Sequence, residues 1–326
     1  MADRLISIGV IGAGIMGERL MRAALEHAAD VVRVAGVWDP SPASLARISR
    51  ELPPVPLLDS PEAVVAAADC VYVASPPASH LGHARRALAA GRALFCEKPL
   101  AVDPADARAF VAEAGAARAA VNFPFASSFA VQHLQSWIAE GVIGTPRSLG
   151  IEVAFATWPR SWQRDAAAWL DGPAQGGFTR EVVSHFLFLA RRLLGELVLQ
   201  SGRARFPEPG LSERGLSARL TAGGVPVTLS GTVGTTVHDD HNVFTLTGSL
   251  GSVRLRDWSI AERLQAGTWH PDPDALPNAR IRPLVLRRQL EGVAHLVAGE
   301  PHALATLAEA FEVQSVVEAI LAEDGH

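Results

Sequence analysis

One segment near the amino terminus restricts the possible folds more than any other part of the chain. Gly12-Ala13-Gly14-Ile15-Met16-Gly17 follows a strand-like apolar run, Ile6 to Ile11, and opens a helical pattern that continues to Ala28. In this strand–turn–helix context, the first glycine permits a tight turn and the second lets the backbone approach a pyrophosphate. The third glycine lets the helix pack closely on the sheet, and the helix N-terminus holds the anion. We therefore expect Gly12, Gly14, Ile15, Met16 and Gly17 to contact a dinucleotide; the alternative is an ordinary glycine-rich turn.

The first 120 residues alternate short apolar runs with amphipathic segments. Further strand-like runs cover residues 31–38, 70–75, 93–96 and 119–123, and helical patterns cover residues 80–90 and about 104–117. Short apolar strands separated by helices are typical of a doubly wound parallel sheet. The fold class is therefore α/β, with an N-terminal Rossmann domain expected over residues 1–121.

The remainder of the chain has a different pattern. Helical patterns cover residues 130–140 and about 181–194, on either side of a strand-like segment and a Trp-rich loop. Residues 197–255 are rich in Thr and Val with Gly turns, as in an antiparallel sheet, and two helical patterns close the chain. We expect an α+β domain over residues 122–326 with a large, mostly antiparallel open sheet, whose last helix can pack back on the Rossmann domain.

Composition excludes several classes of protein. The 326 residues carry a formal charge of -5 with mixed signs, which argues against nucleic acid as a partner. Apolar runs are strand-sized and interrupted by charge, so no membrane-spanning helix is expected. Met1-Ala2-Asp3-Arg4 leaves no room for a signal peptide, and Cys70 and Cys96 lie in apolar runs, as suits a reducing compartment. We expect a cytoplasmic protein.

Asp39 stands at the end of the second predicted strand, 22 residues after Gly17. A carboxylate at this point accepts the ribose hydroxyls of adenosine and repels a 2′-phosphate, which favours NAD over NADP. Ser41 and Arg47 could assist a phosphate if the loop turned, so NADP stays the less favoured alternative. Asp39 could also be a turn residue ahead of Pro40.

Glu97, Lys98 and Pro99 follow the apolar run of residues 93–96. Parallel strands deliver their carboxyl ends to the ligand crevice, so this triplet is expected to face the nicotinamide half of the dinucleotide. A surface ion pair between Glu97 and Lys98 is the alternative.

Five short motifs occur in an order and spacing that carry a family resemblance: Ala74-Ser75-Pro76-Pro77-Ala78-Ser79-His80, the Ala-x-x-Ala-Gly of residues 87–91, Cys96-Glu97-Lys98-Pro99-Leu100, Gly141-Val142-Ile143-Gly144 and Gly248-Ser249-Leu250-Gly251-Ser252. They resemble the glucose–fructose oxidoreductase, inositol dehydrogenase and rhizopine-catabolism (Gfo/Idh/MocA) family of NAD(P)-dependent enzymes. The resemblance covers nearly the whole chain, and the Glu-Lys-Pro triplet is its most distinctive part.

The resemblance implies roles for residues of the first domain. It implies that Lys98 reaches the nicotinamide ribose and the substrate hydroxyl, and that the Lys98–Pro99 peptide is often cis. It also places Ser75, Pro76, Pro77, His80 and Glu97 with Lys98 among the residues expected to contact the cofactor. A lysine in this role is a fixed cation that polarises the reacting oxygen.

The segment Gly176 to His185 occupies the place of the family's glycine-rich segment with an acid and a histidine four residues apart. Mapped onto this chain, His185 is the expected general acid/base and Glu181 its orienting or substrate-binding partner. The acid is Glu rather than the commoner Asp. Arg180 could bind a carboxylate or phosphate of the substrate, or could equally pair with a nearby acid.

Asn122-Phe123-Pro124-Phe125 stands where many relatives carry a Tyr-Arg pair, so the pocket is expected to be less polar. Asn122 and Trp162, one of three Trp residues in the following loop, are candidate substrate contacts. His238-Asp239-Asp240-His241 lies in a strand pattern that sends its side chains to opposite faces, so no metal site is expected.

Three functions are compatible with these residues. The first is reversible oxidation of a hydroxyl on a sugar, cyclitol or related derivative, with hydride transfer to nicotinamide assisted by Lys98 and His185. The second is reduction of an imine or conjugated carboxylated substrate, and the third is non-catalytic dinucleotide sensing. The resemblance also implies a homodimer or homotetramer formed through the open sheet.

Overall fold

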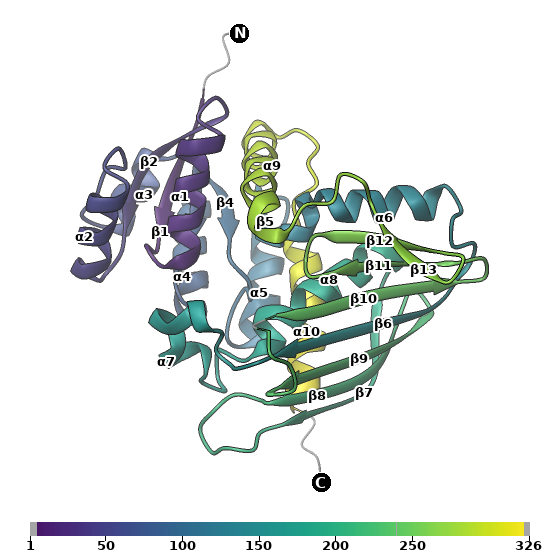
Figure 1. Cartoon of the computed structure of the whole chain (residues 1–326). Coiled ribbons are helices and arrows are strands. Elements are labelled where there is room, and N and C mark those ends of the chain that lie inside the picture. The colour runs from purple at the N-terminus through teal and green to yellow at the C-terminus, as the bar shows by residue number, and fades with distance from the viewer. Residues whose placement is uncertain (1–4, 239, 323–326) are drawn as a thin grey trace. The chain divides into compact units, whose positions relative to one another are not determined.

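The computed structural model describes residues 5–238 and 240–322. The chain divides into two compact units, which Figure 1 shows with their elements labelled. The first unit contains the residues up to Ser127 together with Arg282–Phe311, and the second contains Ser128–Ile281 together with the residues from Glu312 on. Met1–Arg4, on which the signal-peptide expectation rested, and Asp239 of the His-Asp-Asp-His run lie outside the described residues.

The first unit is built on a parallel sheet of five strands in the order β2-β1-β3-β4-β5. The strands are β1 (Ile6–Ile11), β2 (Val32–Trp38), β3 (Cys70–Val73), β4 (Ala93–Cys96) and β5 (Ala119–Val121). Their central members are buried on both faces, which explains why their sequences are continuous apolar runs rather than alternating ones. The predicted Rossmann sheet is confirmed.

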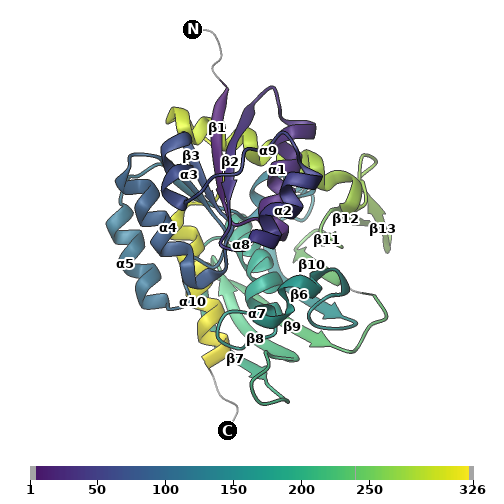
Figure 2. The ribbon, with the colours of Figure 1, turned by 90° about the vertical axis from the view of Figure 1, so that its left-hand side faces the viewer.

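Helices cover both faces of this sheet, as Figure 2 shows with α1 and α2 on one side and α3, α4 and α5 on the other. These helices are α1 (Ile15–His27), α2 (Pro42–Glu51), α3 (Pro61–Ala67), α4 (Pro77–Ala89) and α5 (Pro104–Ala114). A short 3-10 turn, η1 (Pro124–Ser127), follows β5. The part of α9 (Asn278–Ala298) that belongs to this unit packs in the same core as α1, through Leu286, Leu290 and Val293.

Local sequence explains where these helices begin. α2, α3 and α5 each start with a proline preceded by a residue whose side chain accepts a backbone N–H of the first turn: Ser41, Ser60 and Asp103. Proline suits the first helical position because its missing N–H has no partner to lose there.

The second unit contains an eight-stranded sheet in the order β13-β12-β11-β10-β6-β9-β8-β7, antiparallel except for the β6–β9 pair. Its strands are β6 (Pro146–Phe155), β7 (Leu197–Arg205), β8 (Gly215–Ala222), β9 (Val225–Val233), β10 (His241–Gly248), β11 (Ser252–Arg256), β12 (Ile260–Gln265) and β13 (Thr268–Pro271). Ile151, Leu229 and Phe244 are buried on one face, whereas Glu152 and Thr228 on the other are exposed. This alternation indicates a sheet with one packed face, as expected for a mostly antiparallel sheet.

The helical segments of the second unit are α6 (Phe129–Ala139), η2 (Ser161–Ala166), α7 (Ala167–Leu170), the π-helix η3 (Thr179–Val183), α8 (Ser184–Leu194) and the end of α10 (Leu307–Ala322). α6 contacts β11 and β12, and α8 contacts β7 and β8. The α10 residue Ile320 packs against Gly202 of β7.

Two local predictions needed correction. The single helix expected from about Glu181 is a π-helical turn followed by α8, and the strand expected through His238 begins only at His241. Separate helices at α2 and α3 had not been predicted, since each is a short segment between strands. Within the described ranges, the helices are too short or too polar to cross a membrane.

Candidate functional site

The glycine loop after β1 is shaped by close contacts. Gly12 has φ +107, and a Cβ there would lie 2.6 Å from the backbone of Ala74, so only glycine fits beside the loop after β3. A Cβ on Gly17 would lie 2.0 Å from the carbonyl oxygen of Gly12, which explains the close packing of α1 on its own loop. Beside Gly14, in contrast, a Cβ would meet nothing within 4 Å among the described residues. The open side of the loop is therefore at Gly14.

The loop fits a dinucleotide pyrophosphate. Gly14 is the N-cap of α1 and has no side chain to accept the N–H groups of the first turn, unlike the N-cap residues of α2, α3 and α5. Helix N-termini in this condition bind anions through free N–H groups and the helix dipole. The residues present therefore suit an NAD-type ligand.

Asp39 follows β2 and binds the glycine loop. Its Oδ2 accepts the backbone N–H of Ala13 at 2.7 Å, and its Oδ1 accepts the N–H of Ser41 at 2.8 Å. Asp39 is thus also a turn residue, as the alternative expectation had it. Each carboxylate oxygen has further lone pairs, so this arrangement leaves acceptor capacity for ribose hydroxyls.

His80 on α4 connects the two loops that follow β3 and β4. Its Nδ1 lies 2.8 Å from the carbonyl oxygen of Pro99 and its Nε2 lies 2.7 Å from that of Ser75. Burial lowers the pKa of His80, and the neutral ring donates one of these hydrogen bonds, whereas the imidazolium donates both. In either charge state His80 fixes the spacing between the Ser75-Pro76-Pro77 loop and the Glu-Lys-Pro turn.

Glu97 is held inside the first unit by a network of polar side chains. Its Oε1 accepts a hydrogen bond from the Tyr72 hydroxyl at 2.5 Å and from the Asn122 side-chain amide at 2.6 Å. The Asn122 carbonyl oxygen in turn accepts a hydrogen bond from the Gln289 amide of α9. Burial and the Glu97 carboxylate raise the pKa of Tyr72 well above its usual value, so its hydroxyl remains a donor.

Lys98 follows at the carboxyl end of β4, is 9% exposed, and is joined to Pro99 by a cis peptide, as the family resemblance implied.

Four of the predicted site residues lie at the same edge of the parallel sheet. Gly12, Asp39, Ser75 and Lys98 follow the carboxyl ends of β1, β2, β3 and β4, respectively. The strand order reverses between β1 and β3, the place where open α/β sheets bind ligands.

In the second unit, the segment before α8 carries Glu181 on a π-helical turn. The Ser184 N–H donates to the carbonyl of Thr179, five residues earlier, and the Ser184 hydroxyl donates to the carbonyl of Arg180 at 2.7 Å. π-Helical turns of this kind occur frequently at functional sites. Glu181 lies within this π-helical turn, and His185 lies in the first turn of α8 that follows it.

The Arg180 guanidinium binds Glu318 of α10. Its Nε donates to Oε1 at 2.7 Å and its Nη2 to Oε2 at 2.6 Å, a bidentate pair with both side chains largely buried. Its Nη1 donates to the carbonyls of Pro173 and Gly176. Of the two roles that the sequence left open, the structure shows the pairing with an acid.

His185 is 8% exposed and its ring lies 5.5 Å from that of Trp258, edge to face. Trp258 belongs to the turn between β11 and β12, where Asp257 and Trp258 both have positive φ, and it also contacts Phe186. Two consecutive positive φ values are typical of a tight hairpin turn. Trp258 had not been predicted here, because Trp, unlike Gly or Asn, seldom adopts a positive φ.

Glu213 is a second residue near the predicted site that the sequence did not indicate. It is fully buried, and its Oε1 accepts the backbone N–H of Thr179 at 2.7 Å and the Thr179 hydroxyl at 2.6 Å, at the start of the π-helical turn. Its Oε2 is buried with no hydrogen-bond partner among the described residues. Burial raises the pKa of Glu213. No local signal in the sequence distinguishes this glutamate from a surface one.

The aromatic loop after β6 divides between core and surface. Trp158 is buried against Phe155 and Phe178, whereas Trp162 is 40% exposed and lies under the Arg160 guanidinium at 4.7 Å. Arg160 also pairs with Asp240 at 2.9 Å. Among the residues with described positions, no cluster of three or more His, Cys, Asp or Glu side chains could hold a metal.

A glycine loop at the switch point of a parallel sheet, joined to a large mostly antiparallel sheet, defines an NAD-binding oxidoreductase of two units. Residues 6–123 match a family model described as an oxidoreductase family with an NAD-binding Rossmann fold, and residues 131–254 match the GFO/IDH/MocA C-terminal domain. These ranges span most of the chain, and the protein belongs to the Gfo/Idh/MocA oxidoreductase family.

Similar proteins include an inositol 2-dehydrogenase of Acidothermus cellulolyticus, 36% identical over 154 residues, which are 44% of this chain and 43% of that one. The chain's matches span no more than half the length of the curated relatives of highest similarity.

The solved structures that share the fold include the following two. An oxidoreductase of Agrobacterium radiobacter in complex with NAD+, L-tartaric acid and magnesium has a TM-score of 0.83 and 18% identity, over 98% of this chain and 97% of that one. Levoglucosan dehydrogenase in complex with NADH and levoglucosan has a TM-score of 0.84 and 18% identity, over 98% and 96%. At these identities the likeness shows the fold alone.

Proposed function

We propose that the protein is an NAD-dependent dehydrogenase that interconverts a hydroxyl and a carbonyl on a sugar, a cyclitol or a related derivative. The observation that carries the proposal is the convergence of the glycine loop, Asp39, Ser75 and Lys98 on one edge of the parallel sheet. Family membership and the inositol 2-dehydrogenase named above support the substrate class.

Each residue has a stated role in this proposal. Bound NAD supplies the hydride acceptor. Lys98 places a positive charge beside the reacting oxygen, which stabilises the negative charge that develops on it. His185 accepts the hydroxyl proton during oxidation and returns it during reduction, and Glu181 orients His185 or the substrate. Asn122 and Trp162 remain candidate substrate contacts.

The amino-acid usage of the chain supports a special role for Lys98. The sequence contains 28 arginines and a single lysine, which is Lys98. An ammonium is a compact point charge on a flexible stem, whereas a guanidinium is a planar fork. A role that needed charge alone would be open to arginine, so we expect Lys98→Arg to be nearly as inactive as Lys98→Met.

The test mixes the protein with NAD+ or NADP+ and a panel of sugars and cyclitols, and follows absorbance of the reduced nicotinamide. We expect turnover with at least one polyol, and a fall of about 10²-fold or more for Lys98→Arg, Lys98→Met and His185→Asn. His270→Asn, an exposed histidine, is the matched control. Full activity of the Lys98 and His185 variants would disprove the mechanism.

The two other functions have less support. Arg180, the anchor offered for a carboxylated substrate, is paired with Glu318, and a dinucleotide sensor has no use for Lys98 and His185. Activity limited to carboxylated substrates, or NAD binding without any reaction, would favour one or the other.

We also propose that the protein forms a homodimer or homotetramer through the exposed face of the eight-stranded sheet, where Glu152 and Thr228 lie. Sedimentation equilibrium tests this, and a monomer at micromolar concentration would refute it.

Cys70 and Cys96 are buried free thiols whose pKa values burial raises, as suits a reducing compartment.

A further inference from the structure

Arg47 on α2 reaches back to the glycine loop. Its Nη2 donates to the carbonyl oxygen of Ala13 at 2.6 Å, while the N–H of the same residue donates to Asp39 at 2.7 Å. One loop residue is thus held by a guanidinium through its carbonyl and by a carboxylate through its N–H. Arg47 therefore lies near the carboxylate that is expected to receive the adenosine ribose.

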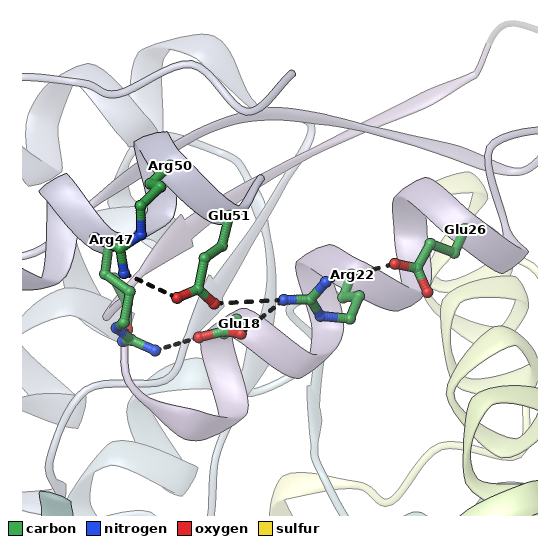
Figure 3. A network of polar contacts seen from close by, with 7 residues as sticks. Glu18, Arg22, Glu26, Arg47, Arg50 and Glu51 are labelled. Carbon is green, nitrogen blue, oxygen red and sulfur yellow. Dashed lines mark hydrogen bonds and ion pairs between the residues drawn. The ribbon is translucent and has the colours of Figure 1, made fainter. Parts of the chain in front are cut away.

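A second acid holds Arg47 in this position. The Arg47 Nη1 forms an ion pair with Glu18 in the first turn of α1, and Glu18 also accepts a hydrogen bond from Arg22 at 2.9 Å (Figure 3). The Glu18 side chain is 17% exposed and that of Arg47 is 32% exposed, so the pair is only partly screened by water.

The pair belongs to a larger network of alternating charges on α1 and α2. Arg22 lies 3.6 Å from Glu26 and 3.7 Å from Glu51, and Glu51 lies 3.0 Å from Arg50 (Figure 3). Each cation in the network faces at least one carboxylate. The charge of Arg47 is accordingly compensated before any ligand arrives.

This arrangement bears on the choice between NAD and NADP, which differ by one 2′-phosphate on the adenosine ribose. An acid at the end of the second strand favours the free hydroxyl, and a nearby arginine accommodates the phosphate. The chain carries both residue types at this place, Asp39 and Arg47, so the discrimination depends on which of them faces the ribose with its charge available.

We propose that Glu18 is a specificity-determining residue for the dinucleotide. By pairing with Arg47 it keeps the guanidinium on the Ala13 carbonyl and neutralises it, which leaves the Asp39 carboxylate to repel a 2′-phosphate. Glu18 acts through Arg47 and is a positioning residue rather than a catalytic one. The inference rests on the proposed function only in that the glycine loop binds a dinucleotide.

The experiment measures binding rather than turnover. NAD+ and NADP+ are titrated by calorimetry into the full-length wild-type protein, Glu18→Gln, the double variant Glu18→Gln/Arg47→Gln, and Glu51→Gln. Glu51→Gln removes the same charge from the same network but touches Arg22 and Arg50, so it is the matched control. Thermal unfolding of each protein by circular dichroism checks that it is folded, and Glu18→Ala replaces Glu18→Gln if the latter does not fold.

The quantity of interest is the ratio of the dissociation constant for NADP+ to that for NAD+. We expect Glu18→Gln to lower this ratio by at least about threefold, the effect of one partly exposed ion pair. The ratio should stay within about twofold of wild type for the other two proteins. The double variant has no guanidinium at position 47 to bind the 2′-phosphate, and Glu51→Gln leaves the Glu18–Arg47 ion pair intact.

A ratio unchanged by Glu18→Gln, or changed as much by Glu51→Gln, would overturn the inference. A gain that persists in the double variant would overturn it too, since the gain must come from Arg47. If neither dinucleotide binds to any of the proteins, the proposed function itself fails. If NAD+ binds and the ratio does not move, only the role of Glu18 is refuted.

Discussion

The carboxylate of Glu97 lies 2.6 Å from the side-chain amide of Asn122, inside the first unit. Glu97 is therefore the structural member of the Glu-Lys-Pro turn, because its charge is met by hydrogen bonds from Asn122 and Tyr72. Lys98, the next residue, then starts from a backbone position that is fixed by a buried network. The turn combines a buried acid that sets its geometry with a lysine whose positive charge serves the proposed mechanism.

Replacing Asn122 tests this network. Asn122→Ala leaves Glu97 with one donor fewer and Gln289 without its acceptor, so we expect a loss of about 1–3 kcal/mol in the free energy of unfolding. Urea denaturation followed by circular dichroism measures it. Gln265→Ala, at an exposed end of β12, is the control and should change stability by less than about 0.5 kcal/mol. Equal stability of Asn122→Ala and wild type would contradict the structural role.

The glycine loop allows stability to be separated from binding. Gly17→Ala places a methyl group 2.0 Å from the Gly12 carbonyl, so α1 must shift, and we expect a loss of about 1–3 kcal/mol in stability. The methyl group of Gly14→Ala meets no neighbouring atom within 4 Å among the residues that the structure describes, so this variant should unfold like wild type. Its methyl group occupies the open side of the loop, so NAD binding should weaken by at least about tenfold, roughly 1.4 kcal/mol. Calorimetric titration and thermal unfolding of both variants check the contrast, which fails if Gly14→Ala binds NAD normally.

The ion pair between Arg180 and Glu318 is expected to matter for stability. Arg180→Met leaves a largely buried carboxylate without its cation, and we expect a loss of about 3 kcal/mol in the free energy of unfolding. Arg85→Met, which breaks an exposed pair with Glu113, is the control and should leave the unfolding midpoint nearly unchanged. Similar behaviour of the two variants in urea would show that burial of the Arg180 pair has no energetic consequence.

The buried carboxyl of Glu213 predicts a pH dependence. Burial raises its pKa in the folded protein above the ordinary value, about 4.3. Between these two pKa values the folded protein retains a proton that the unfolded chain has released, so this group lowers stability as pH rises. Glu213→Gln cannot lose a proton, and its amide oxygen can still accept the two hydrogen bonds from Thr179.

We therefore expect the stability of Glu213→Gln relative to wild type to increase as the pH is raised from about 4 to 8. This range begins near the ordinary pKa of the group, where the unfolded chain starts to release the proton. Urea denaturation of both proteins across this range measures the difference. A difference that stays constant with pH would show that Glu213 has the same pKa in the folded and unfolded states.

Some features of this protein follow from short stretches of sequence. The strands of the first unit are continuous apolar runs, which predicted them directly. α2, α3 and α5 all begin at prolines with a capping residue before them, although only α5 of these three helices was predicted. The glycine loop was predicted because its backbone positions require glycine. Asp39 was predicted because a carboxylate at the end of the second strand suits the ribose hydroxyls.

Contacts between distant segments could not be predicted in this way. Thr179 and Glu213 are 34 residues apart, Arg180 and Glu318 are 138 apart, and Asn122 and Gln289 are 167 apart. Any of these polar residues could equally have faced solvent, since the choice of partner depends on which elements pack together and not on the neighbours of each residue in the chain.

The sequence alone predicted the class of fold and the dinucleotide loop, because these depend on residue type and spacing, whereas the roles of Lys98, Glu181 and His185 were implied by the family resemblance and stay predictions. The tertiary structure decided which charges are compensated: Arg180 by Glu318, Arg47 by Glu18, and Glu97 by neutral donors. Electrostatic compensation depends on distance in space and on burial, and neither quantity is written in a linear pattern of residues.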